Sequence, residues 1–364
     1  MERTEGQDTT TLEPTAAVPT TKRSLVLVVG SGRSGTSLFT GILQRLGFHV
    51  PQPEVPADET NPRGFAESQW VVDFHTRLLR RAGVQVSDAR PSAWARTADI
   101  ALDDHVRRDL RRWVGQQFGQ SDHVIVKDPR LSWFLPLWRR CAEDVGVSPR
   151  FATMLRHPAA VVDSKQRSYG GWQGDVDRTA GWINQVLFTE RATRGAPRAF
   201  VRYDDLLDDW TKEIGHVGDA LDLAVVRDAP AAAIVGIHEF VDRTLARSRT
   251  SWDGFDIPEG LRELADEVWE LACRLSGPEA DSGDLAASLD VARADYIRLY
   301  EDAEAIAQSS IVAGRRSGHA RQSRRASSVL RRVDRVFPKR YRQRIPVRWR
   351  RAVVHALHRA PGGR

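Results

Sequence analysis

The stretch LVLVVGSGRSGTSLFTGILQRLG, residues 25–47, decides the fold of this chain. It begins with an unbroken run of Leu and Val, which is typical of a strand buried on both faces of a parallel sheet. A glycine-rich turn follows, and apolar residues then recur at helical spacing from Gly35 to Leu46. This order predicts an anion-binding loop, because backbone N–H groups and the helix dipole converge where the helix begins.

The same order of strand, turn and helix recurs further along the chain. HVIVKDPR predicts a strand that ends at Lys127, RFATMLRHP one that ends at Arg156, and RAFVRYDDLL one that ends at Tyr203. Strands that alternate with helices predict an α/β fold, here a P-loop-like parallel sheet flanked by helices on both faces. Ligands of such sheets bind beyond the carboxyl ends of the strands, so we expect a site near Gly30 and these three residues.

The chain of 364 residues has room for one large α/β domain and additional segments. We expect a disordered leader at 1–23, the α/β domain at 24–280, a helical spacer at 281–314 and a basic amphipathic tail at 315–364. Further helices are expected at 230–247, 258–275 and 286–308. The leader has no apolar stretch of the signal-peptide kind, and Cys141 and Cys273 show no redox or metal spacing, so we expect a cytoplasmic protein.

Charge is distributed unevenly along the chain. Residues 315–364 contain 17 Lys and Arg against one acidic residue, which leaves 37 basic and 47 acidic side chains in the other 314 residues. The excess of basic residues therefore belongs to the tail, and the rest of the chain does not have the charge of a nucleic-acid binder. Apolar residues at helical spacing among the tail arginines favour binding to an anionic surface, at the inner face of the membrane. Nucleic acid, an acidic partner protein and a merely solvated tail are the alternatives.

The glycine loop departs from that of nucleotide hydrolases. Their pattern is G-x-x-x-x-G-K-[ST], in which the lysine reaches the outer phosphates of the nucleotide. Gly30 and Gly35 have this spacing, but Thr36 occupies the position of the lysine. A P-loop phosphotransferase or kinase is therefore disfavoured, although it stays an alternative. Arg33, on the loop itself, is placed instead to contact a short anionic group, with neighbouring Ser and Thr hydroxyls as further donors.

GSGRSGTS, residues 30–37, resembles the 5′-phosphosulfate loop of sulfotransferases that use 3′-phosphoadenosine 5′-phosphosulfate (PAPS). LRHPAAVVDSKQRSYG, residues 155–170, resembles the 3′-phosphate element of that family, which has an arginine at a strand end and a serine eight residues later. GFAE (64–67), VKDPRL (126–131) and VRYDDLL (201–207) are similar to segments of its bacterial members, and the resemblance covers about residues 24–255. It implies transfer of a sulfuryl group from PAPS to a hydroxyl, without a metal ion.

The resemblance also implies which residues bind PAPS. A nucleotide with a phosphosulfate at one end and a phosphate on its ribose needs two separated anion sites, and the two segments supply them on neighbouring strands. LARSRTSW, residues 245–252, is similar to a later segment that closes over the nucleotide in the family. The residues implied to bind PAPS are Gly30, Ser31, Gly32, Arg33, Ser34, Gly35, Thr36, Ser37, Arg156, Ser164, Arg247 and Arg249.

Three residues are candidates for the chemistry. Arg33 would stabilise the charge that develops on the leaving phosphate, and only electrostatically, since a guanidinium does not give up its proton. Lys127 is either a donor to the sulfuryl group or a structural partner of Asp128. Glu67 is the preferred general base, because a glutamate downstream of the loop commonly serves in carbohydrate-acting members of the family. The alternatives for the base are Glu54 and, less favoured, His49, His75 and Glu59.

A glutamate base implies that the acceptor is a hydroxyl of a carbohydrate or glycolipid, such as a lipid-linked sugar. The loop at 50–66 and the segments around 85–100 and 170–185 are expected to shape the acceptor site. Trp172 is a candidate for stacking on a sugar ring, with a place in the core as the alternative. A non-catalytic membrane-surface protein on the same fold is a further alternative, and it predicts that the donor does not bind.

Overall fold

The computed structural model describes residues 23–59, 61–170, 173–242 and 250–336, and from residue 310 onward it describes the main chain only. The candidate PAPS-binding residues Arg247 and Arg249 lie outside the described residues, as does Trp172. Nearly all of the predicted leader and residues 337–364 of the tail lie outside them as well.

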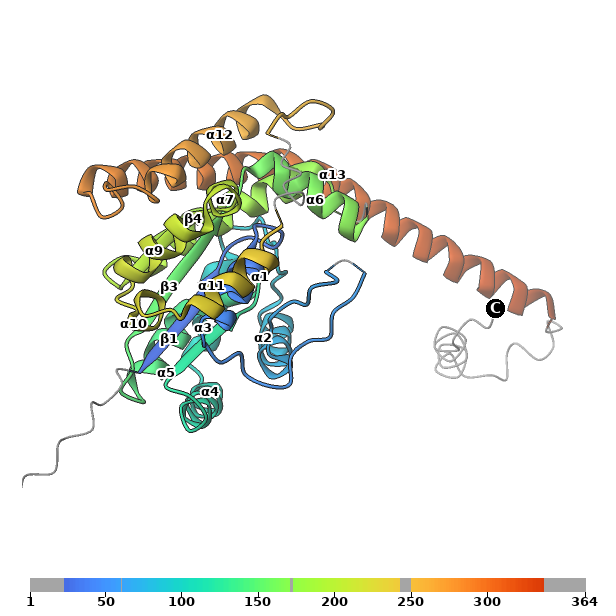
Figure 1. Cartoon of the computed structure of the whole chain (residues 1–364). Coiled ribbons are helices and arrows are strands. Elements are labelled where there is room, and N and C mark those ends of the chain that lie inside the picture. Colours follow the sequence, from blue (N-terminus) through green and yellow to red (C-terminus); the bar gives the residue numbers. More distant parts are fainter. Residues whose placement is uncertain (1–22, 60, 171–172, 243–249, 337–364) are drawn as a thin grey trace, which may run out of the picture. The chain divides into compact units, whose positions relative to one another are not determined.

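A four-stranded parallel sheet forms the centre of the fold (Figure 1). Its strands are β1 (Ser24–Val29), β2 (His123–Lys127), β3 (Pro149–Leu155) and β4 (Arg198–Arg202), in the order β2-β1-β3-β4. In register, Val28 of β1 lies opposite Lys127 of β2 and Ala152 of β3. The predicted α/β class is confirmed. Because all four strands are parallel, the residues predicted at strand ends stand at one edge of the sheet.

Helices connect the strands and follow them. They are α1 (Thr36–Arg45), α2 (Gln69–Ala82), α3 (Ala93–Ala101), α4 (Asp104–Gln117), α5 (Leu135–Glu143), α6 (Pro158–Tyr169), α7 (Asp175–Thr193), α8 (Tyr203–Asp208), α9 (Trp210–Ala220), α10 (Ala224–Arg227), α11 (Ala231–Phe240), α12 (Glu259–Arg274) and α13 (Gly283–Val336), with a 3₁₀ turn at Leu131–Phe134. The helix predicted at 230–247 is shorter, because Val241 has an extended backbone that ends α11. α3 and α7 were not predicted; α7 is buried on nearly every side and so lacks an amphipathic period.

The apolar run of β1 is buried on both faces of the sheet. Leu25, Leu27 and Val29 belong to one hydrophobic cluster, which they share with α2, α3, α4 and α5. Val26 and Val28 belong to a second cluster, which they share with α1, α9 and α11. Side chains alternate between the two faces of a strand, so an unbroken apolar sequence is what a sheet covered on both sides requires.

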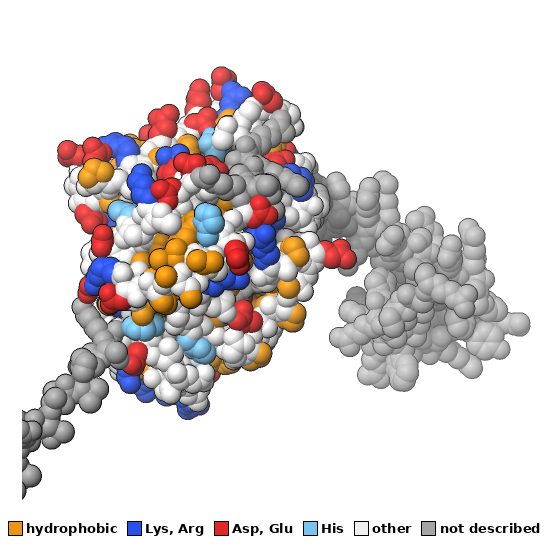
Figure 2. Space-filling view, viewed as in Figure 1, with side chains coloured by type: hydrophobic (Ala, Val, Ile, Leu, Met, Phe, Trp, Pro, Cys, Tyr) orange, Lys and Arg blue, Asp and Glu red, His pale blue; other side chains and the backbone are white. Residues whose placement is uncertain are grey.

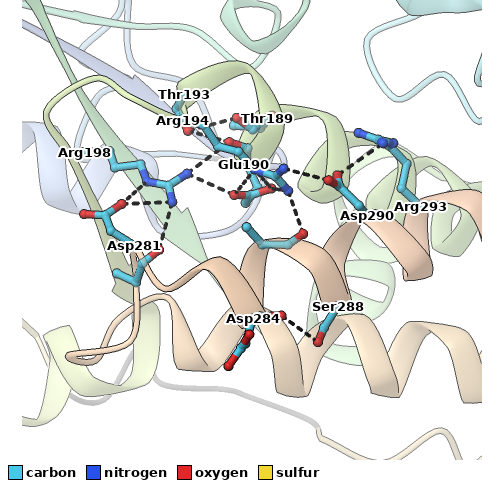
Figure 3. Close-up of polar contacts among 12 residues, drawn as sticks. Thr189, Glu190, Thr193, Arg194, Arg198, Asp281, Asp284, Ser288, Asp290 and Arg293 are labelled. Atoms are coloured by element: carbon cyan, nitrogen blue, oxygen red, sulfur yellow. Dashed lines mark hydrogen bonds and ion pairs between the residues drawn. The ribbon is translucent and has the colours of Figure 1, made fainter.

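A buried ion-pair network fastens α7 and β4 to the beginning of α13 (Figure 3). Arg194 donates to both carboxylate oxygens of Glu190, with Nε–Oε1 2.9 Å and Nη2–Oε2 2.7 Å, and Arg198 donates to Oε1 at 3.0 Å. Arg194 also pairs with Asp290 at 2.9 Å, and Arg198 also pairs with Asp281 at 3.1 Å. The hydrogen bond to Glu190 raises the pKa of Arg194 above its ordinary value. Two cations thus neutralise one buried carboxylate, the condition under which a buried charge is tolerated.

The compact unit that contains the sheet runs as far as Ile297, and Arg298–Arg364 form a second unit. In the part of the chain that the structure describes, no helix is long and apolar enough to cross a membrane. Figure 2 shows acidic and basic side chains interspersed over the face in view, with hydrophobic side chains gathered near the centre, where Figure 1 places α11. Ile234 and Val235 of that helix are exposed.

Candidate active site

The glycine loop between β1 and α1 is built from left-handed backbone. Gly30 has φ 136°, Arg33 φ 75° and Gly35 φ 90°, so the chain reverses within a few residues. Two of these positions also lack room for a side chain: a Cβ on Gly30 would lie 2.6 Å from the carbonyl oxygen of Met154, and one on Gly35 would overlap the ring of Tyr203. Only glycine satisfies both the conformation and the space at Gly30 and Gly35.

The beginning of α1 presents its backbone N–H groups without a side-chain cap. Gly35 occupies the cap position, and the first turn contains no acidic residue. The first N–H groups of a helix have no partner within the helix and carry the positive end of its dipole. Thr36 and Ser37, the first two residues of α1, line the cavity in front of the loop, so the helix start is placed to hold an anion there.

Residues from β3 and α6 close onto the loop. Ser164 accepts a hydrogen bond from Arg33 Nε at 3.1 Å, and Arg156 Nη1 donates to the Arg33 carbonyl oxygen at 2.9 Å. Arg156 also stacks on the ring of Tyr203, with 4.5 Å from its guanidinium carbon to the ring centroid. Its Nε is buried and has no hydrogen-bond partner among the described residues, and burial lowers the pKa of Arg156. The two predicted anion-binding elements therefore meet, with one buried donor unsatisfied.

Lys127 and Glu67 form a buried ion pair beside the loop. Lys127 Nζ lies 2.5 Å from Glu67 Oε1, and it also donates to Ser37 Oγ at 3.0 Å and to the Phe65 carbonyl oxygen at 3.0 Å. These three contacts use the three N–H groups of the ammonium. Burial raises the pKa of Glu67, and the charge of Lys127 opposes that shift. The carboxylate is thus held rigidly, and it lines the same cavity as Arg33.

The suggested pairing of Lys127 with Asp128 is wrong. Asp128 accepts instead from Arg130 Nη1 at 2.8 Å and from His75 Nδ1 at 2.9 Å. His75 Nε2 in turn accepts from the indole N–H of Trp138 at 2.9 Å, so the imidazole is fixed between two partners and fully buried. His75 therefore belongs to the core and has no access to a substrate.

Glu54, Glu59 and His49, the remaining candidates for the base, also lie away from the cavity wall. Glu54 Oε1 accepts from Gln52 at 2.9 Å and from Gln44 at 3.1 Å. Glu59 is exposed, and His49 lies beside β2, where it forms a bridge to Val124. Among the five candidates, all of them described, Glu67 lines the cavity and the others do not.

These elements enclose a cavity of about 610 Å³, within the range of small-molecule sites. Two carboxylates, Glu67 and Asp242, line it. The basic residues in its wall are more numerous: Arg33, Arg63, Lys127, Arg130, Arg156 and Arg167. A cationic cavity in a unit whose sequence is acidic overall attracts an anionic ligand. No group of three or more His, Cys, Asp or Glu within the described residues is arranged to hold a metal ion.

The predicted site residues divide into those that face the cavity and those that support it. Gly32, Arg33, Gly35, Thr36, Ser37, Arg156 and Ser164 line the cavity. Ser31 and Ser34 turn inward: Ser31 Oγ accepts from Lys165, and Ser34 Oγ donates to the Ser31 carbonyl oxygen. The Gly30 carbonyl oxygen accepts from Gln185 at 3.4 Å. Of the segments expected to shape the acceptor site, 50–66 contributes to the wall through residues 61–65, whereas the described residues of 85–100 and 170–185 do not.

Several cavity residues were missed by sequence reasoning. Arg63 donates to the Phe240 carbonyl oxygen at 2.5 Å and pairs with Asp242 at 3.1 Å, which fastens the 50–66 loop to the end of α11. Arg167 stands one helical turn after Ser164, a spacing that could have placed it on the same face of α6. Nothing in the loop pattern around Arg63 could have identified its partners.

Comparison with known proteins identifies the family of this chain. A model of the sulfotransferase family matches residues 26–228, so the chain belongs to that family and is a sulfotransferase. Among solved structures it is similar to the sulfotransferase domain from the Synechococcus PCC 7002 olefin synthase, at 18% identity and TM-score 0.36, with 75% of this chain and 96% of that chain covered. It is also similar to the sulfotransferase domain from the curacin biosynthetic pathway, at 15% identity and TM-score 0.40, with 70% and 98% covered. Comparison with curated proteins finds no matching relative.

Proposed function

We propose that this sulfotransferase takes its sulfuryl group from PAPS. The observation that carries the proposal is the meeting of two anion-binding elements in one cavity, the glycine loop at the start of α1 and the Arg156–Ser164 pair of β3 and α6. The buried Nε of Arg156 supports it, because a phosphate oxygen would satisfy that donor. The excess of cations in the cavity wall suits a nucleotide that carries several negative charges.

The residues of the cavity have separate tasks in this proposal. PAPS, when bound, supplies the sulfuryl group and a phosphate leaving group. Arg33 and the backbone N–H groups of the loop stabilise the charge that develops on that phosphate. Glu67 accepts the proton of the acceptor hydroxyl. Lys127 holds the Glu67 carboxylate, favours its ionised form and joins it to Ser37 of the loop.

Calorimetric binding of adenosine 3′,5′-bisphosphate in EDTA, with ATP as the control nucleotide, tests the donor. We expect the bisphosphate to bind and ATP not to bind. Arg33→Ala and Arg156→Ala should each weaken binding by about tenfold or more, since each removes a charge-assisted hydrogen bond worth roughly 1.5–3 kcal/mol. Arg227→Ala is the matched control, because Arg227 pairs with Asp222 at an exposed position.

Unchanged affinity in both cavity variants, with unfolding transitions like that of the wild type, would overturn the assignment of the anion sites. Binding of ATP alone, restored by magnesium, would favour the phosphotransferase instead. A folded chain that binds neither nucleotide would favour the non-catalytic alternative.

We further propose that the acceptor is a hydroxyl of a carbohydrate or glycolipid. The support is the glutamate in the position of the base, the type that carbohydrate-acting members use, and the absence of any histidine from the described cavity wall. Transfer of radiolabelled sulfate from PAPS to lipid-linked sugars, free oligosaccharides and simple phenols tests this proposal. We expect label in the sugar-containing acceptors, and label in the phenols alone would refute it.

The basic tail supports a location in the cytoplasm at the inner face of the membrane, as a second part of the proposal. Its 17 basic residues would bind anionic headgroups, and the attraction weakens as salt screens it. Co-sedimentation of the full chain with vesicles tests this. We expect binding to vesicles that contain phosphatidylglycerol and none to vesicles of phosphatidylcholine, and equal binding to both would contradict the idea.

A further inference from the structure

Lys165 of α6 is a buried cation that lies behind the glycine loop. The residue is 4% exposed, and its Nζ donates to Ser31 Oγ at 3.0 Å and to Ser87 Oγ at 2.9 Å. No carboxylate of the described residues forms an ion pair with it. Burying an ammonium with only hydroxyl partners is unfavourable, because the lost hydration is not replaced by an opposite charge. Such a position needs a compensating role.

α6 holds the glycine loop at two points through consecutive residues. Ser164 contacts Arg33 on the cavity side, and Lys165 contacts Ser31 on the inner side. The Ser31 carbonyl oxygen in turn accepts the N–H of Ser34 at 3.1 Å, so the hydroxyl held by Lys165 belongs to the residue on which the turn closes. Lys165 does not line the cavity, and it therefore acts on a ligand through the loop.

We propose that Lys165 is a positioning residue for the anion loop, whose ammonium fixes Ser31 and places a positive charge behind the loop that the bound nucleotide neutralises from the front. This inference rests on the proposed function, since it takes the anion to be the phosphosulfate end of a nucleotide. It explains why a buried ammonium has no carboxylate partner among the described residues: an internal carboxylate would compete with the ligand for the same charge.

The charged groups around Lys165 set its proton affinity. Burial and, less strongly, the neighbouring Arg178 lower the pKa of Lys165 to about 8, and Asp177 opposes them. Asp88, which follows Ser87, is paired with Arg90 at 2.6 Å. On the loop, Arg33 adds a further positive charge on the cavity side.

A bound anion favours the ammonium form, so the pKa of Lys165 rises when the nucleotide binds. Affinity is then greatest at pH values below the pKa of the free protein and falls as the pH rises through it. Binding above that pKa takes up a proton. The phosphates of the ligand do not contribute, because their second ionisation is complete well below pH 8.

Calorimetric titration of the full chain with adenosine 3′,5′-bisphosphate at pH 7.5 and 9.0, in buffers of different ionisation enthalpy, tests the inference. The wild type should bind up to about tenfold more weakly at pH 9.0 and take up most of one proton there, as expected one pH unit above the pKa. Lys165→Met should bind the bisphosphate roughly tenfold more weakly than the wild type at pH 7.5. Its affinity should not fall between pH 7.5 and 9.0 as that of the wild type does, and its binding at pH 9.0 should not take up a proton. Arg227→Ala is the control, since Arg227 pairs with Asp222 at an exposed position and has no contact with Lys165 among those described, and it should behave as the wild type does.

Binding by the wild type without proton uptake at pH 9.0 overturns the inference, and this measurement decides even where Lys165→Met does not fold. A folded Lys165→Met chain with the affinity and pH dependence of the wild type overturns it as well. A wild type that does not bind the bisphosphate at pH 7.5 refutes the proposed function and this inference together.

Discussion

Replacing Gly35 by Ala tests how closely the glycine loop is fitted to the rest of the cavity. Two penalties combine at this position. A non-glycine residue at φ 90° costs about 1–2 kcal/mol in backbone strain. The added Cβ would also overlap Tyr203 Cδ2 and lie 2.8 Å from Cε2, and overpacking of this kind costs about 1–3 kcal/mol. Gly35→Ala should therefore lower the free energy of unfolding by about 2–5 kcal/mol.

Gly47 provides the matched control, because it lies just beyond the other end of α1 with φ 102° and with no atom within 4 Å of an added Cβ. Gly47→Ala should cost the backbone strain alone, about 1–2 kcal/mol. The difference between the two variants in urea unfolding then isolates the clash with Tyr203. Tyr203→Ala in the Gly35→Ala background should reduce the cost of the glycine substitution toward the Gly47 value, which a double-mutant cycle measures.

The clash has a consequence for binding as well as for stability. Tyr203 must move to admit the Cβ, and its ring now stacks on Arg156 at 4.5 Å. Loss of a cation–π contact worth about 0.5–2 kcal/mol would weaken bisphosphate binding roughly two- to thirtyfold. A Gly35→Ala chain that is as stable as Gly47→Ala and binds like the wild type would refute this explanation of the loop.

Three further predictions concern the base, the ion-pair network and the cysteines. Glu67→Gln should abolish sulfuryl transfer and retain bisphosphate binding. Because burial raises the pKa of Glu67, kcat/KM of the wild type should rise with pH at a pKa above that of an ordinary glutamate. A rise of kcat/KM at the ordinary pKa of a glutamate would contradict this. Glu190→Ala leaves two arginines without their buried carboxylate and should lower the free energy of unfolding in urea by about 3–5 kcal/mol. Asp281→Ala removes an exposed partner and should lower it by less than about 1 kcal/mol. Equal losses in the two variants would argue against the network. Burial raises the pKa of both Cys141 and Cys273 to about 11, so both thiols should react slowly with iodoacetamide at pH 8. Cys141, which is fully buried, should not be labelled until the protein unfolds, and rapid labelling of Cys141 in the native chain would contradict this.

The sequence by itself determined the sheet and the edge at which the site lies. A short run of Leu and Val that ends in a glycine-rich turn is typical of a strand covered on both faces, and the ends of such strands are visible where glycine, lysine, arginine and tyrosine interrupt the apolar residues. The loop at 30–37 could also be predicted, because its glycines and hydroxyls are contiguous and their task is local. Arg156 and Ser164 could be predicted for the same reason, since they are close in sequence and one strand-to-helix turn joins them.

Only the tertiary structure decided which partner each charged side chain has. Glu67 pairs with Lys127, 60 positions away, and Lys165 contacts Ser31, 134 positions away, in both cases across elements whose packing no periodicity encodes. The same holds for Arg63, whose contacts with Phe240 and Asp242 join an irregular loop to α11. The physical reason is that hydrophobic period and turn chemistry act over a few residues, whereas an ion pair in the interior depends on how complete layers of helix and sheet come together.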